Sequence, residues 1–149
     1  MTDLKKRLFE ACEQYVEERI ARVEKAINDL EDALKLETKC SMGDKYETGR
    51  AMLHLEFEKL SGQHEQYRKL RKTIRMMPPG PFKKVTFGSA VETSAANYYI
   101  SIPAGELKVG DKSFYAVGAA SPIAQALSGK KLGENVTFGG KQLKIISIL

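Results

Sequence analysis

The amino-acid sequence predicts an α+β protein: an N-terminal antiparallel coiled-coil hairpin followed by an antiparallel sheet with one short helix. Two observations support this prediction. Apolar residues recur every three or four positions through most of residues 1–77, which is the spacing of a coiled-coil seam. From residue 82 onward, short segments of alternating apolar and polar residues are separated by glycine-containing turns, as is typical of antiparallel strands.

Each half of the hairpin has its own set of inward-facing positions. In the first half these are Phe9, Cys12, Val16, Ile20, Val23, Ile27, Leu30 and Leu34. In the second half they are Leu53, Phe57, Leu60, His64, Tyr67, Arg71 and Ile74. Neither stretch contains proline, so each predicts a helix of ~30 residues or more and a rod of roughly 45–50 Å.

The two apolar patterns mirror each other about a point between Gly43 and Asp44. In an antiparallel pair this reflection places Leu34 opposite Leu53. By the same rule it pairs Leu30 with Phe57, Ile27 with Leu60 and Val23 with His64. The pattern therefore places the tip of the hairpin near residues 40–48. Because the seam is filled within one chain, we expect a monomer rather than a dimer formed through the rod.

Two polar features of the second helix admit mainly structural interpretations. His64 occupies an inward position opposite Val23, so we interpret it as a half-buried packing residue without a metal or catalytic role. A basic cluster at the end of the helix has no acid within it. It is either solvated helix surface or a contact for an acidic protein or a nucleic acid, and its members are Arg68, Lys69, Arg71, Lys72 and Arg75.

Residues 78–81 form a linker, since the prolines of Pro78-Pro79-Gly80-Pro81 cannot continue the second helix. The C-terminal domain then covers residues 82–149. Its predicted strands are Lys84–Phe87, Tyr98–Ile102, Ser113–Val117, Asn135–Phe138 and Gln142–Ile148. A short helix interrupts them, with Ser121 as its cap, Pro122 at its first position and Gly129 at its end.

Charge and cysteine content bear on partners and compartment. The net charge is +5. Residues 1–77 carry 16 Lys and Arg against 15 Asp and Glu, a difference of +1, and residues 78–149 carry 8 against 4, a difference of +4. A straight helix would separate Cys12 and Cys40 by roughly 40 Å, which excludes a disulfide between them. Reduced thiols, with no secretory or membrane-spanning segment, favour a cytoplasmic protein without a membrane partner.

Asp44 and Glu47 lie three residues apart at the predicted start of the second helix, and two interpretations stay open. In one, Asp44 caps the helix and Glu47 returns a bond, as in a capping box. In the other, both carboxylates project from one helical face and share a hard cation such as Mg²⁺. Two carboxylates supply too few oxygens for Mg²⁺, so the second interpretation requires another protein to complete the site.

Three sequence motifs resemble those of the Gre family of bacterial transcript-cleavage elongation factors. The tip sequence Gly43-Asp44-Lys45-Tyr46-Glu47 is similar to the family's Gly-Asp-x-x-Glu. The segment from Ser121 to Lys130 closely follows the family's Ser-Pro-Ile-Ala-x-Ala-Leu-x-Gly-Lys, and Val85–Val91 resembles its entry strand. The resemblance covers nearly the whole chain.

The resemblance implies an FKBP-like C-terminal domain that docks on RNA polymerase, while the coiled coil enters the secondary channel of the polymerase. It implies that Asp44 and Glu47 help the polymerase to hold a catalytic Mg²⁺ and to cut backtracked RNA. The protein would then have no active site and no cofactor of its own, only the Mg²⁺ of the polymerase. Ser121, Pro122 and Ile123 would contribute to docking.

The tip departs from the family pattern at Thr48, Gly49 and Arg50. The basic residues Lys39, Lys45 and Arg50 either contact the transcript RNA or balance the acids in solution. A Gre-like inhibitor that blocks the channel without stimulating cleavage therefore stays an alternative. Prolyl isomerisation by an FKBP-like domain is a further one, which the lack of Trp and of a clear aromatic pocket disfavours.

Overall fold

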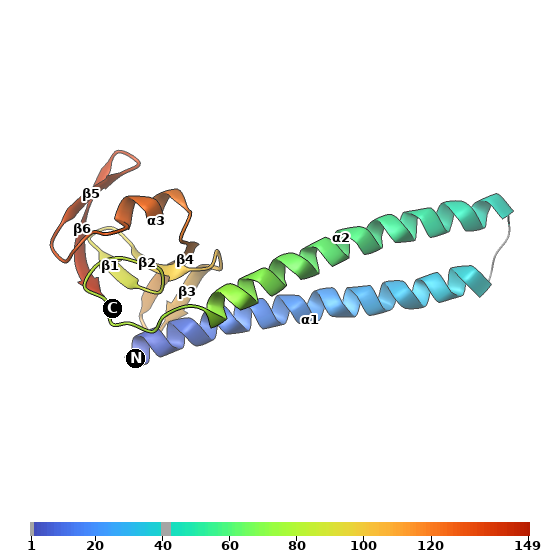
Figure 1. The fold of residues 1–149 in the computed structure, drawn as a ribbon, viewed down its shortest axis with the longest axis horizontal. Helices are drawn as coiled ribbons and strands as arrows, with labels where there is room; N and C mark the ends of the chain where they lie inside the picture. The colour runs from blue at the N-terminus through green and yellow to red at the C-terminus, as the bar shows by residue number, and fades with distance from the viewer. Residues whose placement is uncertain (1, 40–42) are drawn as a thin grey trace. The chain divides into compact units, whose positions relative to one another are not determined.

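The computed structural model describes residues 2–39 and 43–149, with the side chains of all of them except residues 37–39 and 43–48. Two long helices, α1 (Asp3–Lys39) and α2 (Gly43–Arg75), precede six strands and a short helix, α3 (Pro122–Leu127), as Figure 1 shows. The predicted fold class is thereby confirmed. The chain divides into two compact units: Val16–Arg71, and Met1–Tyr15 together with Lys72–Leu149.

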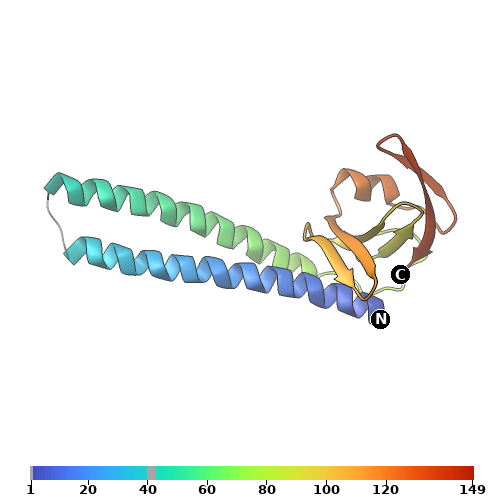
Figure 2. The same cartoon turned by 180° about the vertical axis from the view of Figure 1, so that it is seen from behind.

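The unit Val16–Arg71 is the helical hairpin. Figures 1 and 2 show α1 and α2 lying side by side along its length. Its buried side chains on α1 are inward positions that the heptad pattern predicts, namely Val16, Ile20, Val23 and Leu30. The facing positions of α2 are only partly buried, so the apolar seam between the two helices is shallow.

Polar pairs between the two helices confirm the mirrored register. His64 Nε2 lies 3.1 Å from Glu24 Oε1. About two turns further along α2, Arg71 donates from Nε and from a terminal nitrogen to the two carboxylate oxygens of Glu17, at 2.8 and 2.7 Å. Both pairs obey the predicted reflection to within one residue. His64 is half-buried as expected, with Glu24 as a partner that the apolar pattern alone does not reveal.

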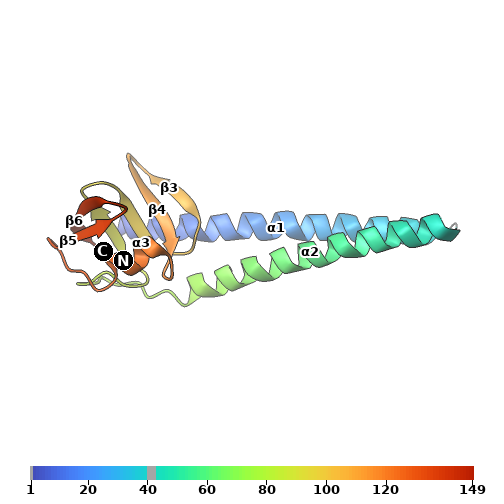
Figure 3. The same ribbon diagram turned by 90° about the horizontal axis from the view of Figure 1, so that it is seen from above.

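The second unit contains one six-stranded sheet in the order β3-β4-β2-β1-β6-β5. Its strands are β1 (Ala90–Thr93), β2 (Asn97–Ser101), β3 (Gly105–Val109), β4 (Lys112–Gly118), β5 (Asn135–Phe138) and β6 (Lys141–Ile148). Figure 3 shows β3 and β4 at one edge. All neighbours pair antiparallel except β2 and β4, which are parallel. The expectation of a wholly antiparallel sheet was wrong at this one pair.

The predicted strand Lys84–Phe87 was also wrong. Only an isolated bridge between Lys84 and Lys131 forms there. The backbone amide of Val85 donates to Lys130 O, and a turn follows at once because Ser89 N bonds back to Thr86 O. The local hydrogen bonds are therefore used by a loop and a turn. Strands β1 and β3 were not predicted, whereas the other four were, to within one residue at either end.

Both faces of the sheet are covered within this unit. One face packs with α3 into a core that includes Val91, Ile100, Leu127, Val136, Leu143 and Ile145. The other face carries the fully buried Tyr99 and Phe114. There the first turns of α1 contribute, since Cys12 Sγ lies 3.6 Å from Ser101 Oγ on β2.

This packing shifts the buried face of α1 near its start. The heptad pattern predicts Phe9 as an inward residue, but Phe9 is only half-buried, while Lys5 and Leu8 are buried. The reason is that the sheet, rather than α2, determines which side of these turns is covered. Within the described ranges, no helix is both long enough and apolar enough to cross a bilayer.

Candidate functional site

The predicted tip lies where the two long helices approach their shared end. Helix α1 ends at Lys39 and α2 begins at Gly43, so Asp44 and Glu47 belong to the first turns of α2. The side chains of Lys39, Asp44, Lys45 and Glu47 lie outside the described residues. The choice between a helix cap and a shared cation site therefore stays a prediction. Their backbone placement at the start of a helix suits carboxylates, because the macrodipole favours negative charge there.

Arg50, the third basic residue predicted near the tip, is described and exposed. Its Nε lies 3.4 Å from Nε2 of His54, one turn further along α2. The same end of the hairpin exposes three large apolar side chains, Leu36, Met52 and Leu55, at 62%, 66% and 67%. None of the three was predicted as a site residue from the sequence. The sequence feature that could have identified them is that they are large and apolar but do not occupy inward positions of the heptad pattern.

Ser121 caps α3 as predicted. Its hydroxyl accepts a hydrogen bond from Ala124 N at 3.3 Å and donates one to Gly118 O at 2.7 Å. Pro122 occupies the first turn and is exposed, whereas Ile123 is only 8% exposed and belongs to the core. Of the three predicted docking residues, only Pro122 is exposed. The Ile123 side chain instead anchors α3 to the sheet.

The basic cluster at the end of α2 is partly neutralised. Arg71 forms the bidentate pair with Glu17 of α1, and Arg68 lies 3.8 Å from Glu65. The hydrogen bonds that Arg71 donates to Glu17 raise the pKa of Arg71. The sequence hides this neutralisation because Glu17 is 54 residues away along the chain. Solvated, ion-paired helix surface therefore accounts for Arg68 and Arg71.

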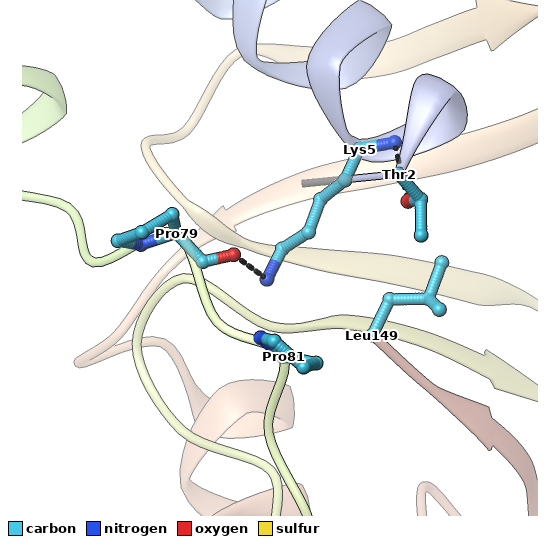
Figure 4. Close-up of a pocket in the computed structure, with 5 residues that line it drawn as sticks. All are labelled: Thr2, Lys5, Pro79, Pro81 and Leu149. Carbon is cyan, nitrogen blue, oxygen red and sulfur yellow. Dashed lines mark hydrogen bonds between the residues drawn. The ribbon is translucent and has the colours of Figure 1, made fainter.

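A cavity of about 310 Å³ lies beside the start of α1, lined by Thr2, Lys5, Pro79, Pro81 and Leu149. Figure 4 shows the Lys5 side chain crossing it toward Pro79. Lys5 is 2% exposed, and its Nζ donates to Pro79 O at 2.8 Å.

The ammonium group of Lys5 also lies 4.4 Å from the centroid of the Phe82 ring. Burial lowers the pKa of Lys5 to about 8. A Cβ at Gly80 would meet Lys5 Nζ at 2.6 Å, so a glycine there leaves room for the ammonium group.

Cys12 is a core residue, as predicted from the sequence. Its thiol is buried, and burial raises its pKa to about 11. Tyr99, buried on the same face of the sheet, also has a raised pKa because of burial. Neither group is poised to ionise at neutral pH. Cys40 lies outside the described residues, so the expectation that it forms no disulfide with Cys12 stays a prediction.

Among the described side chains, no group of three or more His, Cys, Asp and Glu residues gathers in a way that could hold a metal ion. This finding does not cover the tip carboxylates of Asp44 and Glu47, because their side chains are not described. Their chemistry rests on their backbone positions and on the sequence.

No protein-family model matches this chain. No curated protein matches it either. Solved structures that match include Gfh1 of Thermus aquaticus, at 16% identity and a TM-score of 0.36, over 93% of this chain and 94% of that chain.

A second is GreA factor homolog 1 of Thermus thermophilus, at 19% identity and a TM-score of 0.34, over 95% of this chain and 94% of that chain. The transcription factor Gfh1 also matches, at 16% identity and a TM-score of 0.35, over 99% and 95% of the two chains.

Proposed function

We propose that this protein is a Gre-like transcription elongation factor. It binds RNA polymerase, inserts the tip of its hairpin in the secondary channel, and stimulates the polymerase's own cleavage of backtracked RNA. It acts as a monomer and has no active site of its own. The observation that carries the proposal is the position of Gly43-Asp44-x-x-Glu47: the first turns of α2, at the far end of a long helical hairpin.

The dimensions of the hairpin support this proposal. Helix α2 has 33 residues. At about 1.5 Å per residue it spans roughly 50 Å, a length that suits an element reaching into a channel. The shallow seam and the cross-helix pairs of Glu17 and Glu24 hold the two helices in one register. A fixed register is needed if the acids are to arrive at a defined place.

Asp44 and Glu47 would act as oxygen donors in an active centre that the polymerase completes. Carboxylates suit Mg²⁺, which prefers hard oxygen ligands. When bound, a second Mg²⁺ activates water and stabilises the leaving oxygen of a phosphodiester. The acids of this chain need only share a cation that the polymerase partly holds and orient the attacking water. Lys39, Lys45 and Arg50 would lie near the RNA phosphates.

A channel-blocking regulator without cleavage activity is the second candidate. The observation that favours it is the sequence after the second acid, Thr48-Gly49-Arg50, which departs from the family pattern. Gly49 lies in the early turns of α2 and weakens them by up to about 1 kcal/mol relative to Ala. Arg50 adds a positive charge three residues after Glu47 in the sequence. Such a tip could fill the channel without placing both carboxylates.

RNA cleavage by stalled, backtracked elongation complexes separates the two candidates. We expect the wild type to increase the yield of short 3′ fragments at least tenfold, and the double variant Asp44→Ala, Glu47→Ala to abolish this increase. Glu31→Ala, Asp32→Ala, which removes two exposed acids of α1, is the matched control and should behave as the wild type. If the wild type and the tip variant both suppress nucleotide addition without cutting RNA, the blocking function is correct.

A further inference from the structure

A groove of about 340 Å³ lies on the C-terminal unit, and none of the residues predicted to dock lines it. It is lined by Phe82, Lys83, Lys131, Leu132 and Ile148. The loop after α3 and the segment before β1 form it together: Val85 N donates to Lys130 O at 2.9 Å, and Gly129 N donates to Val85 O at 2.8 Å. These bonds fix two segments that are 45 residues apart in the sequence.

Two lysines, Lys83 and Lys131, line the groove, and a third, Lys84, is next to Lys83 in the sequence. Lys84 and Lys131 are direct partners in an isolated antiparallel bridge. Residues opposite each other in such a bridge point to the same side, and like charges there are destabilising. Among the described side chains, no acid forms an ion pair with Lys83, Lys84 or Lys131. An anionic partner would remove the repulsion.

The groove also has apolar surface, and this surface indicates which class of anionic partner fits it. Leu132 is 64% exposed, and Ile148 and Phe82 supply further apolar surface. A phosphate backbone gains nothing from Leu132. An aromatic ring could stack on a base, but the ammonium of Lys5 lies over the Phe82 ring, 4.4 Å from its centroid. One face of the ring is therefore engaged, and stacking of a base is disfavoured.

We propose that this groove binds an acidic segment of RNA polymerase that inserts one apolar side chain beside Leu132. The inference rests on the proposed function. Lys83 and Lys131 receive the carboxylates, and Phe82, Leu132 and Ile148 receive the apolar side chain. The surplus charge of the domain agrees with such a partner, since residues 78–149 carry 8 Lys and Arg against 4 Asp and Glu.

The groove lies at the opposite end of α3 from Ser121. The helix has six residues, so its two ends are about 9 Å apart. An acidic segment in the groove and a contact at Pro122 can thus belong to one continuous interface. In that interface the groove supplies positive charge, because the first turn of α3 carries no charged side chain.

The test is the affinity of the full-length protein for purified core RNA polymerase, measured by titration of fluorescently labelled protein at several salt concentrations. We expect Lys83→Glu, Lys131→Glu to weaken binding at least tenfold and to flatten its salt dependence. Leu132→Ser should weaken binding three- to tenfold without changing that salt dependence. The matched control is Lys141→Glu, Lys144→Glu, which makes the same change of charge on β6 and should stay within twofold of the wild type.

Two results of the polymerase titration would overturn the inference while leaving the proposed function standing. One is binding by the Lys83→Glu, Lys131→Glu variant within twofold of the wild type. The other is equal loss with the Lys141→Glu, Lys144→Glu control, which would mean a non-specific charge effect. Binding of the groove to a protein-free RNA–DNA hybrid, lost in the groove variant, would assign it to phosphates and also overturn the inference. Absence of any binding by the wild type would instead refute the proposed function.

Discussion

Lys5 is the one charged side chain that is buried in the part of the chain the structure describes. It has a backbone acceptor in Pro79 and an aromatic face in Phe82, but no ion pair with a described carboxylate. A buried cation without a counter-charge is costly, and the lowered pKa expresses that cost. The sequence gives no hint of this, because a lysine near the start of a helix is ordinarily solvated.

Stability should therefore depend on pH through Lys5. The pKa of Lys5 is lowered from 10.5 to about 8 in the folded protein. Between these values the unfolded chain binds the proton and the folded chain does not, so the free energy of unfolding rises with pH. Over that range the gain is roughly 3 kcal/mol at about 1.4 kcal/mol per pH unit. It is absent below pH 8, where both states are protonated.

Urea unfolding of the wild type and of Lys5→Met, at several pH values from 7 to 10.5, measures this effect. The difference in unfolding free energy, wild type minus Lys5→Met, should rise by roughly 3 kcal/mol over the range. Lys6→Met removes an exposed neighbour on the same turn and should leave the pH dependence of the wild type unchanged. Parallel curves for the wild type and Lys5→Met would contradict the assignment.

Ser121 combines a structural role with the predicted docking role. Its hydroxyl satisfies one amide of α3 and bonds Gly118 O as well. We expect Ser121→Ala to lower the free energy of unfolding by about 1 kcal/mol. Ser128→Ala, at the other end of α3, is the control and should cost less than about 0.5 kcal/mol. Equal effects of the two substitutions on the urea midpoint would argue against the cap.

At the scale of elements, the pair of Arg71 and Glu17 ties the two long helices together. Both carboxylate oxygens of Glu17 are bonded, and the Arg71 side chain is partly shielded. Bidentate geometry is the case in which an ion pair near the surface contributes measurably.

A double-mutant cycle with Glu17→Gln and Arg71→Gln tests that contribution. The coupling should be about 0.5–1 kcal/mol at low salt and should shrink in 1 M NaCl. The longer, single-turn pair of Glu65 and Arg68 provides the comparison and should couple by less than about 0.5 kcal/mol. A Glu17–Arg71 coupling no larger than that of Glu65–Arg68 would show that the bidentate bonds add nothing in solution.

Elements with strong local signals were predictable, and those defined by distant partners were not. Helix α3 has its cap, its proline and its terminal glycine in a row. The hairpin of β5 and β6 has Gly139-Gly140, both at positive φ, which suit a tight two-residue turn. By contrast, β3 begins at Gly105 directly after Pro103-Ala104 and has only two buried side chains. The parallel pairing of β2 with β4 depends on long-range topology, which no local pattern encodes.

The candidate site likewise has features that the sequence predicted and features that it did not. The position of the acids followed from the mirrored heptads, since α1 and α2 end and begin around Gly43. The buried state of Ile123 did not, because burial on a six-residue helix depends on which face meets the sheet. Nor did the groove lined by Lys83 and Lys131, since its two halves are joined by backbone hydrogen bonds between segments that are distant in the sequence.

At the scale of the whole molecule, helix α1 takes part in both compact units. Its first turns complete the core of the sheet domain, and its remainder forms half of the hairpin. A domain boundary at the proline linker would separate Cys12 from Ser101. Truncation experiments on the sheet domain should therefore retain the first 15 residues, since Leu8 and Cys12 are fully buried.

The central claim is that the tip of the hairpin reaches the catalytic metal of RNA polymerase. Replacing the active-centre Mg²⁺ with Fe²⁺ and adding a reductant and peroxide generates hydroxyl radicals, which cut only protein backbone close to the metal. In a backtracked elongation complex, we expect cuts in this protein confined to residues 40–48, and none when Fe²⁺ is displaced by excess Mg²⁺. Cuts in the sheet domain, or none in a complex that demonstrably contains the protein, would contradict the claim.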